Sequence, residues 1–544
     1  MTFLVVLALP LQSASPVPVP RPQTERLTHP WNALEARKAS IGQIEVVIGD
    51  VFDLSKPEEN IWIGRVANRL HASTREAVIR RVLLFVEGDR VLERRIYETE
   101  RLLRALPFVK HARIDPVLQP DGTVVAVVRV RDAWTTQVNA GYQQVGGQST
   151  QFFELDEKNF LGSGKSVGFD YSKDHERTTW GLSYEDPQLL GSRWTLGART
   201  QFLSDGVVRS FHLERPFFAL DTPWSAGVTL AQSQSSLAFY DQGVQIFKAP
   251  FIQDEVRLAG AVVVRETGDR IWRAGLLLKR QDTHYGPITQ TGPPVALPPP
   301  SLSNRRLRGP ALTLATQKDA FESFEDLQGM DAPEDFNLAW TGDMELGTYT
   351  RSWGSSITAP FFRIQADRGW SSSREDLTLF AASWEGRKPP SGLEASQLGF
   401  SLVQYYKLTS HQIFAALAAV DLARRPDPEH WYYLGGDQGL RGYPNQAHLG
   451  DARWIVSLDY RLLTEQRWWG IVRLGYSAFI DLGSIRQLNG RGWSRTYSDI
   501  GVGLRLGNLK SSLGRVILVS VAKPLNREPY QAAYQVTVGN SMRF

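Results

Sequence analysis

The sequence has no cysteine, only four methionines, and no long hydrophobic run after its first residues. Without cysteine, disulfides, thiolate metal sites and cysteine nucleophiles are excluded. Such a composition suits a protein that crosses an oxidising compartment unfolded, where free thiols would mispair. No later segment approaches the roughly 18 consecutive apolar residues of a membrane helix. The net charge of +4 is too small to indicate a nucleic-acid partner.

The N-terminus has the features of an export signal. Phe3 to Leu11 form a short apolar run, and the small residues Ser13 and Ser15 follow it, as at a signal-peptidase site. The run is too short to span a bilayer, although no lysine or arginine precedes it. We therefore predict a signal peptide at residues 1–15. Residues 16–40 are rich in proline and charge, which predicts a flexible linker.

Residues 41–134 predict a small α/β domain with the order strand, helix, helix, strand, strand. Ser73 and Glu76 have the spacing of a capping box, so a helix is expected to begin there. Asp121-Gly122 predicts a tight hairpin turn. The strand after this turn has alternating apolar residues on one face: Val124, Ala126, Val128 and Val130.

Three segments of this domain resemble a POTRA domain. They are Thr74–Arg81, Glu87–Asp89 and Arg104–Val109. POTRA domains are the periplasmic modules of the BamA/TamA-type outer-membrane assembly factors. The resemblance implies one copy between the linker and residue 134, and an unrelated α/β module is the alternative.

Residues 135–544 predict a transmembrane antiparallel β-barrel, because segments of about ten residues alternate in polarity between turns. In the last segment, Tyr534, Val536 and Val538 alternate with polar residues, and the chain stops at Phe544. A terminal strand that ends in phenylalanine resembles the signal by which outer-membrane proteins are recognised for assembly.

Charged residues in three later segments share one face. These segments contain Arg453 to Arg461, Arg473 to Asp481, and Asp499 to Arg505. The charged face should point into the lumen, since a charge on the lipid side at mid-bilayer costs roughly 2–4 kcal/mol. Up to fourteen alternating segments precede Tyr443 and five follow it. The family resemblance implies roughly 16 strands, so some segments, with the proline-rich stretch 293–300, are expected to form outer loops.

A glycine-rich segment, Gly435 to Tyr443, contains the most informative motif. Its Arg441-Gly442-Tyr443 resembles the Arg-Gly-Phe/Tyr motif of the inward-folded loop of the same superfamily, and Phe479, Asp481 and Gly483 resemble the family's Phe-x-Asp-x-Gly wall motif. The resemblance implies that Arg441 docks against Asp481 inside the lumen. Alternation alone places Asp481 on the lumenal face, and a guanidinium can bond a carboxylate in a bidentate manner. The alternative is a surface turn whose arginine is solvated.

Three further segments resemble the periplasmic turns of these barrels: Glu157–Lys165, Asp186–Trp194 and Glu214–Phe218. Gly162 to Ser166 also resembles part of a nucleotide-binding loop, but Asn159 stands where that motif requires a glycine. No Gly-x-Ser-x-Gly elbow of a hydrolase is present. The sequence therefore predicts no catalytic residue, no cofactor and no metal site.

The resemblance implies a bacterial outer-membrane protein that inserts or translocates polypeptides and is not an enzyme. Expected partners are unfolded outer-membrane or exported polypeptides, outer-membrane lipids and periplasmic accessory proteins, and no nucleic acid. An incoming strand could pair with the edge of the POTRA sheet, or at the seam between the first and last barrel strands. A passive pore or surface antigen, and a lipid-handling barrel, are the alternatives, because a fold does not determine a function.

Overall fold

The computed structural model describes residues 30–52, 54–55, 60, 62, 65, 68–69, 71–145, 148–292, 300–318, 320–331, 333–468, 472–488, 492–508, 516–528 and 531–540. The predicted signal peptide (1–15), most of the linker, residues 293–299 and Phe544 lie outside the described residues. Their predicted roles therefore stay predictions.

A small α/β domain precedes the barrel. Its elements are α1 (Pro30–Ala36), β1 (Ile41–Gly49), α3 (Glu76–Arg80), α4 (Glu93–Arg104), β2 (Val109–Leu118) and β3 (Val124–Asp132). Strand β3 lies in the middle of the sheet, parallel to β1 and antiparallel to β2. One face of β3 is buried together with Ile79 of α3 and with Ile96 and Leu103 of α4. The elements β1, α3, α4, β2 and β3 follow the predicted order, but the described residues 62, 65, 68 and 69 are also helical and were not predicted to be.

Two details of this domain differ from the predictions. Residues 30–36, assigned to the linker, form α1, because the Trp31 side chain is fully buried in the domain core and its Nε1 donates to the Ile114 carbonyl at 2.9 Å. The capping box is also wrong. Helix α3 begins at Glu76, but its N-cap residue is Arg75 and not Ser73, and no side chain caps the helix.

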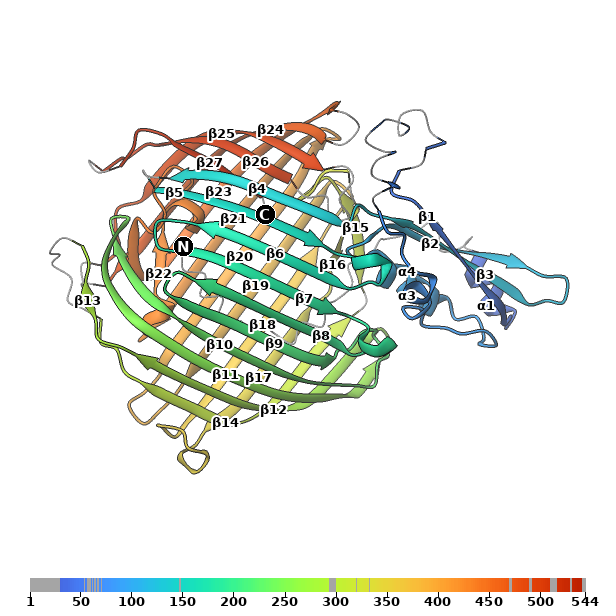
Figure 1. The fold of residues 1–544 in the computed structure, drawn as a ribbon, viewed down its shortest axis with the longest axis horizontal. Coiled ribbons are helices and arrows are strands. Elements are labelled where there is room, and N and C mark those ends of the chain that lie inside the picture. Colours follow the sequence, from blue (N-terminus) through green and yellow to red (C-terminus); the bar gives the residue numbers. More distant parts are fainter. Residues whose placement is uncertain are drawn as a thin grey trace.

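The remaining strands form one large antiparallel sheet that curls into a barrel (Figure 1). They are β4 (Thr136–Val145), β5 (Gln148–Glu157), β6 (Ser166–Lys173), β7 (Thr178–Asp186), β8 (Thr195–Leu203), β9 (Gly206–Arg215), β10 (Trp224–Asp241), β11 (Val244–Thr267), β12 (Arg270–Tyr285), β13 (Thr289–Gln290), β14 (Arg305–Lys318), β17 (Thr341–Tyr349), β18 (Ala359–Trp370), β19 (Asp376–Arg387), β20 (Glu394–Thr409), β21 (Gln412–Arg424), β22 (Tyr432–Leu434), β23 (His448–Trp468), β24 (Val472–Gln487), β25 (Tyr497–Asn508), β26 (Val516–Pro524) and β27 (Gln535–Asn540). Two further strands, β15 (Phe321–Glu325) and β16 (Pro333–Asn337), pair only with each other.

The prediction of a β-barrel is confirmed, but a count of 16 strands is wrong. Among the described residues, 22 strands belong to the large sheet, and β13 and β22 have only two and three residues. The twenty longer strands pair with their neighbours in chain order. We expected some alternating segments to form loops, so that 16 strands would remain. These segments are strands as well, because each one pairs with its neighbour in the sheet.

Side chains alternate between an apolar outer face and a polar lumenal face. Leu276 and Leu312 lie opposite each other on β12 and β14 and are 63% and 64% exposed, as expected of lipid-facing residues. The predicted lumenal charges Arg461, Asp481 and Arg505 are all buried. In the part of the chain that the structure describes, no helix has the length and hydropathy to cross a membrane.

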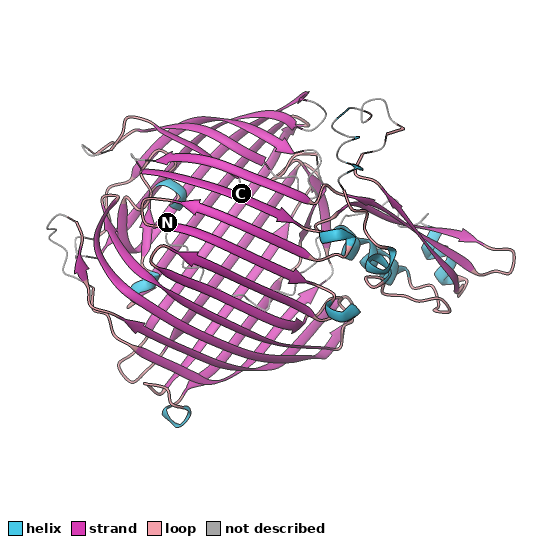
Figure 2. Ribbon diagram, viewed as in Figure 1, coloured by secondary structure: helices cyan, strands magenta, loops and turns pink. Residues whose placement is uncertain are grey.

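The small domain lies at one end of the barrel, and most of the regular structure is strand (Figure 2). The turns between β5 and β6 and between β7 and β8 lie at this small-domain end, and the loop after β21 lies at the far end. The last strand, β27, lies beside the first, β4. In the described residues one register pair, Val536 with Gln144, joins them, whereas six pairs join β26 to β27 and ten join β4 to β5.

Candidate functional site

The loop between β22 and β23 folds against the lumenal wall through Arg441. Its Nε and Nη2 donate to the two carboxylate oxygens of Asp481 on β24, both at 2.8 Å, and its backbone N–H donates to the same carboxylate at 3.2 Å. Both side chains are buried. The arrangement is a bidentate, charge-assisted pair.

The other residues of the two predicted motifs surround this pair. The Arg441 guanidinium lies over the Phe479 ring, 3.4 Å from its centroid. Tyr443 is fully buried, and its hydroxyl donates to the Ser498 carbonyl at 3.1 Å. A Cβ on Gly442 would lie 2.5 Å from the Asp499 Cβ, and one on Gly483 would lie 3.0 Å from the Trp454 carbonyl oxygen. Both glycines therefore permit close contact between loop and wall.

Three wall carboxylates face the single loop arginine. Asp459 lies 3.6 Å from Arg441 Nη1, and Asp499 on β25 is opposite Asp481 in register. All three carboxylates are almost completely buried. Removal of Arg441 would leave them facing one another in the lumen.

A second segment enters the lumen from the small-domain end, and the sequence analysis missed it. Strands β15 and β16 form a hairpin between β14 and β17, and residues 326–331 at its tip lie against the opposite wall. We call residues 321–337 the plug hairpin. The Glu334 carboxylate shapes the tip, since it accepts hydrogen bonds from the backbone N–H groups of Leu327 and Gln328 at 3.1 and 3.0 Å.

Apolar contacts anchor the plug hairpin. Leu327 packs in a buried cluster with Tyr405 of β20 and Ala415 of β21. Met330 is fully buried against Ile413, Leu463 and Val516. Burial of two large side chains of this kind contributes roughly 1.5–3 kcal/mol each. The plug hairpin is therefore part of the packed interior of the barrel.

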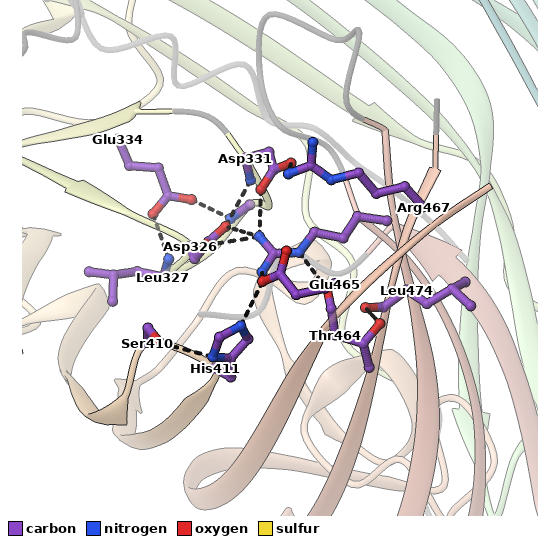
Figure 3. Close-up of polar contacts among 12 residues, drawn as sticks. Asp326, Leu327, Asp331, Glu334, Ser410, His411, Thr464, Glu465, Arg467 and Leu474 are labelled. Atoms are coloured by element: carbon purple, nitrogen blue, oxygen red, sulfur yellow. Dashed lines mark hydrogen bonds and ion pairs between the residues drawn. The ribbon is translucent and has the colours of Figure 1, made fainter. Parts of the chain in front are cut away.

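Charge also holds the plug hairpin. Nη1 of Arg473 lies 3.1 Å from Asp326 and also bonds Asp331, and Arg467 lies 3.1 Å from Asp331 (Figure 3). The signal that could have revealed this contact is the row of inward-facing arginines, Arg461, Arg473 and Arg505. Arg461 bonds the Leu327 carbonyl, and Arg505 donates to the Gln328 carbonyl at 3.3 Å.

Helix α4 of the small domain contacts both the plug hairpin and the barrel rim. The Arg101 guanidinium lies 5.7 Å from the centroid of the Phe321 ring of β15. Burial raises the pKa of Asp335 on β16 to about 7, against the opposing effect of Arg104 and Arg101. The Glu98 carboxylate accepts from the backbone N–H of Leu220, in the turn before β10, at 2.6 Å.

The first barrel turn is bonded to the small domain as well. Asp132, at the end of β3, accepts from the Thr74 backbone N–H at 2.9 Å and lies 2.8 Å from His71 Nε2. Asn159 Nδ2 donates to the Thr74 hydroxyl at 2.8 Å, and the Arg75 N–H donates to the Gly162 carbonyl at 2.9 Å. Gly162, the first residue of the segment that resembled part of a nucleotide-binding loop, and Asn159 both take part in this contact.

One acidic group could be mistaken for a metal site. Ligand atoms of Asp427, Glu429 and His430, in the loop after β21, lie within 4.8 Å of one another. Arg387 bonds both oxygens of Asp427 at 2.8 and 2.7 Å, and Arg305 pairs with Asp427 and Glu429. Arginines already neutralise these carboxylates, so the group is an ion-pair network of the loop.

No protein-family model and no curated protein matches the sequence. Several solved structures do. BamA from Haemophilus ducreyi lacking POTRA domains 1–3 is 13% identical over 92% of this chain and 84% of that chain, with a TM-score of 0.41. CdiB from Acinetobacter baumannii is 12% identical (92% and 73% covered, TM-score 0.42), and CdiB from Escherichia coli is 13% identical (91% and 75% covered, TM-score 0.43). At these identities and TM-scores, the function of this chain has to be argued from its own residues.

Proposed function

We propose that this chain is a bacterial outer-membrane protein that inserts or translocates polypeptides, with its small POTRA-like domain in the periplasm and no catalytic chemistry of its own. The observation that carries the proposal is the seam between β27 and β4. Only one described register pair joins them, so backbone groups of both edges are candidates for pairing with another chain. A strand edge binds an incoming segment through main-chain hydrogen bonds, whatever its side chains.

The small domain supports the same proposal. In its sheet, the order β1-β3-β2 leaves β1 and β2 as edges. Unfolded outer-membrane or exported polypeptides could pair with such an edge before they reach the barrel. Membrane lipids and periplasmic accessory proteins are the further partners we propose.

The plug hairpin argues against a passive pore. Its tip fills part of the lumen and is held by buried apolar contacts and by the Arg473 ion pairs. Any passage through the lumen would have to run beside this segment. We therefore favour a polypeptide-handling barrel over a pore or surface antigen.

Reconstitution tests the proposal. Proteoliposomes that contain the purified protein should accelerate the folding of an added, urea-unfolded outer-membrane barrel, measured by its heat-modifiable mobility in gels. Liposomes that contain an unrelated porin are the control. Equal folding rates in both preparations would contradict an insertase, and a large steady conductance without substrate would support the pore.

A further inference from the structure

An arginine–tryptophan cluster lies on the outer surface of the barrel at the small-domain end. We call Arg193, Trp194, Arg215 and Trp224 the rim cluster. The Arg215 guanidinium lies 4.0 Å from the Trp224 ring centroid, and Arg193 lies 4.5 Å from the centroid of Phe218. The Trp194 and Trp224 rings meet edge to face, with centroids 6.4 Å apart.

The rim cluster points toward the lipid. Arg215 pairs in register with Ala226, and Trp224 lies two residues before Ala226 on the same face of β10. That face continues to Leu230, which is 42% exposed, as is typical of lipid-facing positions. Trp224 itself is 41% exposed. Arg215 and Trp224 therefore lie on the membrane-facing side of the barrel, with the Trp194 ring against Trp224. Arg193, in the turn before β8, lies between the Phe218 ring and the small domain.

Its two arginines lack counter-charges. Among the described residues, neither Arg193 nor Arg215 forms an ion pair; Arg193 Nη2 donates to the Leu83 carbonyl at 2.9 Å, and Arg215 bonds the Trp224 carbonyl. Burial and the neighbouring Arg215 lower the pKa of Arg193. Two adjacent guanidinium groups that face only aromatic rings and carbonyl oxygens form a site for an anion.

We propose that Arg193 and Arg215 bind the phosphate of a phospholipid headgroup, in the leaflet on the small-domain side, with Trp194 and Trp224 flanking it. Guanidinium groups match phosphate oxygens in a bidentate manner. Tryptophan is enriched at the level of the headgroups, where one part of the ring is apolar and the N–H is wet. The inference rests on the proposed membrane location, not on polypeptide insertion.

The turn that carries Arg193 provides a second observation. Leu190 at its tip is 96% exposed and has a left-handed backbone, with φ of 52°. Leu161 in the preceding turn has φ of 53° and is 63% exposed. A leucine rarely adopts this conformation. Strain of this kind, with the apolar side chain held outward, is consistent with insertion of the tips among lipid headgroups and acyl chains.

A bound lipid would act on the small domain as well. The same turn holds this domain through Gln188, whose Nε2 donates to the Val78 carbonyl at 3.1 Å, and through the bond from Arg193 to Leu83. Arg193 therefore contacts both the small domain and the lipid site. Lipid occupancy would stabilise one orientation of the small domain at the membrane.

Native mass spectrometry of the purified full-length protein tests the inference, with phosphatidylglycerol as the probe. Arg193→Gln with Arg215→Gln should weaken retention of the lipid about 25-fold, because each basic residue near an anionic headgroup contributes roughly a fivefold gain. Arg193→Lys with Arg215→Lys should weaken retention by less than the double glutamine variant does, because lysine keeps the charge but not the bidentate geometry. Arg306→Gln is the matched control, since Arg306 is an exposed arginine of β14.

Heat-modifiable gel mobility establishes that each variant is folded. Unchanged lipid binding in a folded double glutamine variant would overturn the site, and so would an equal loss in Arg306→Gln. Displacement of the lipid by inorganic phosphate at equal concentration would show that Arg193 and Arg215 bind free phosphate and not a lipid headgroup, and would overturn the proposed lipid site. A negative result in the insertion assay would not change these outcomes. The lipid site and the proposed insertion of polypeptides can therefore be refuted independently of each other.

Discussion

Arg473 and Asp481 stand eight residues apart on the lumenal face of β24 and bind opposite charges. Asp481 accepts two hydrogen bonds from the Arg441 guanidinium, in the loop between β22 and β23 (residues 435–447), which we call the far-end loop. Arg473 binds Asp326 and Asp331 of the plug hairpin. At about 3.3 Å per residue, the two positions are roughly 26 Å apart. Strand β24 thus holds both segments that enter the lumen. Its acidic residue Asp481 binds the basic far-end loop, and its basic residue Arg473 binds the acidic plug hairpin.

Replacement of Arg441 by alanine should release the far-end loop. Loss of one partner of a buried ion pair costs about 3–5 kcal/mol, because the other charge stays buried without compensation. Arg441→Ala should make limited proteolysis within residues 435–447 faster than in the wild type. The increase should be smaller in the double variant Arg441→Ala with Asp481→Ala, because it leaves no Asp481 charge unpaired. Equal protection of the loop in wild type and Arg441→Ala would mean that the pair does not hold it.

Gly442→Ala should destabilise the loop by a steric effect alone. The new Cβ would lie 2.5 Å from the Asp499 Cβ, and overpacking of this kind costs about 1–3 kcal/mol. Gly260→Ala is the matched control, because its nearest contact would be 3.8 Å away. The measurement is the temperature at which the folded gel band disappears; identical temperatures for the two variants would contradict the close contact.

A disulfide can test whether the plug hairpin moves. A Cβ on Gly507 would lie 2.6 Å from the Met330 Cβ, so Met330→Cys with Gly507→Cys can form a bond after a small shift. The chain has no other cysteine. In planar bilayers, we expect the reduced double variant to show large, transient conductance openings and the oxidised double variant to lose them. The conductance of Met330→Cys alone should not respond to oxidation. Equal steady conductance in both redox states would exclude a plug.

Contact between the plug hairpin and α4 should depend on pH. Burial raises the pKa of Asp335 to about 7 in the folded protein, compared with about 3.9 in an unfolded chain. Protonated Asp335 therefore favours the docked hairpin, and this stabilisation is complete below pH 4 and is lost as pH rises through 7. Amides of β15 and β16 should exchange more slowly at pH 5 than at pH 8, after correction for intrinsic rates. Asp335→Asn should abolish the difference, and a wild type with no difference would refute the prediction.

The far-end site was predictable because its signals are local. Alternation along β24 places Asp481 on the lumenal face, and the Arg441-Gly442-Tyr443 segment is glycine-rich and lies between strands. The small domain followed from apolar periodicity for the same reason. The count of up to nineteen alternating segments came nearer to the 22 strands of the sheet than the 16 that the family resemblance implied.

The plug hairpin was not predictable, because its contacts are distant in sequence. Leu327 and Met330 lie in a segment rich in acidic residues, and their partners lie on β19 to β26. The contact between the residues before α3 and the end of β3 was not predictable for the same reason. Thr74 bonds Asp132, which is 58 residues away, and no local pattern reports that contact.

Depletion of the protein, followed by quantitative proteomics of the outer-membrane and secreted fractions, tests the proposed role in polypeptide insertion or translocation. Cells should be complemented with wild type, with the double cysteine variant in its oxidised form, or with an empty vector. We expect outer-membrane barrels or exported proteins to be lost on depletion and to be restored by the wild type. We expect no restoration by the oxidised double cysteine variant, in which the disulfide holds the plug hairpin against the wall. Unchanged fractions after depletion would contradict a role in polypeptide insertion or translocation.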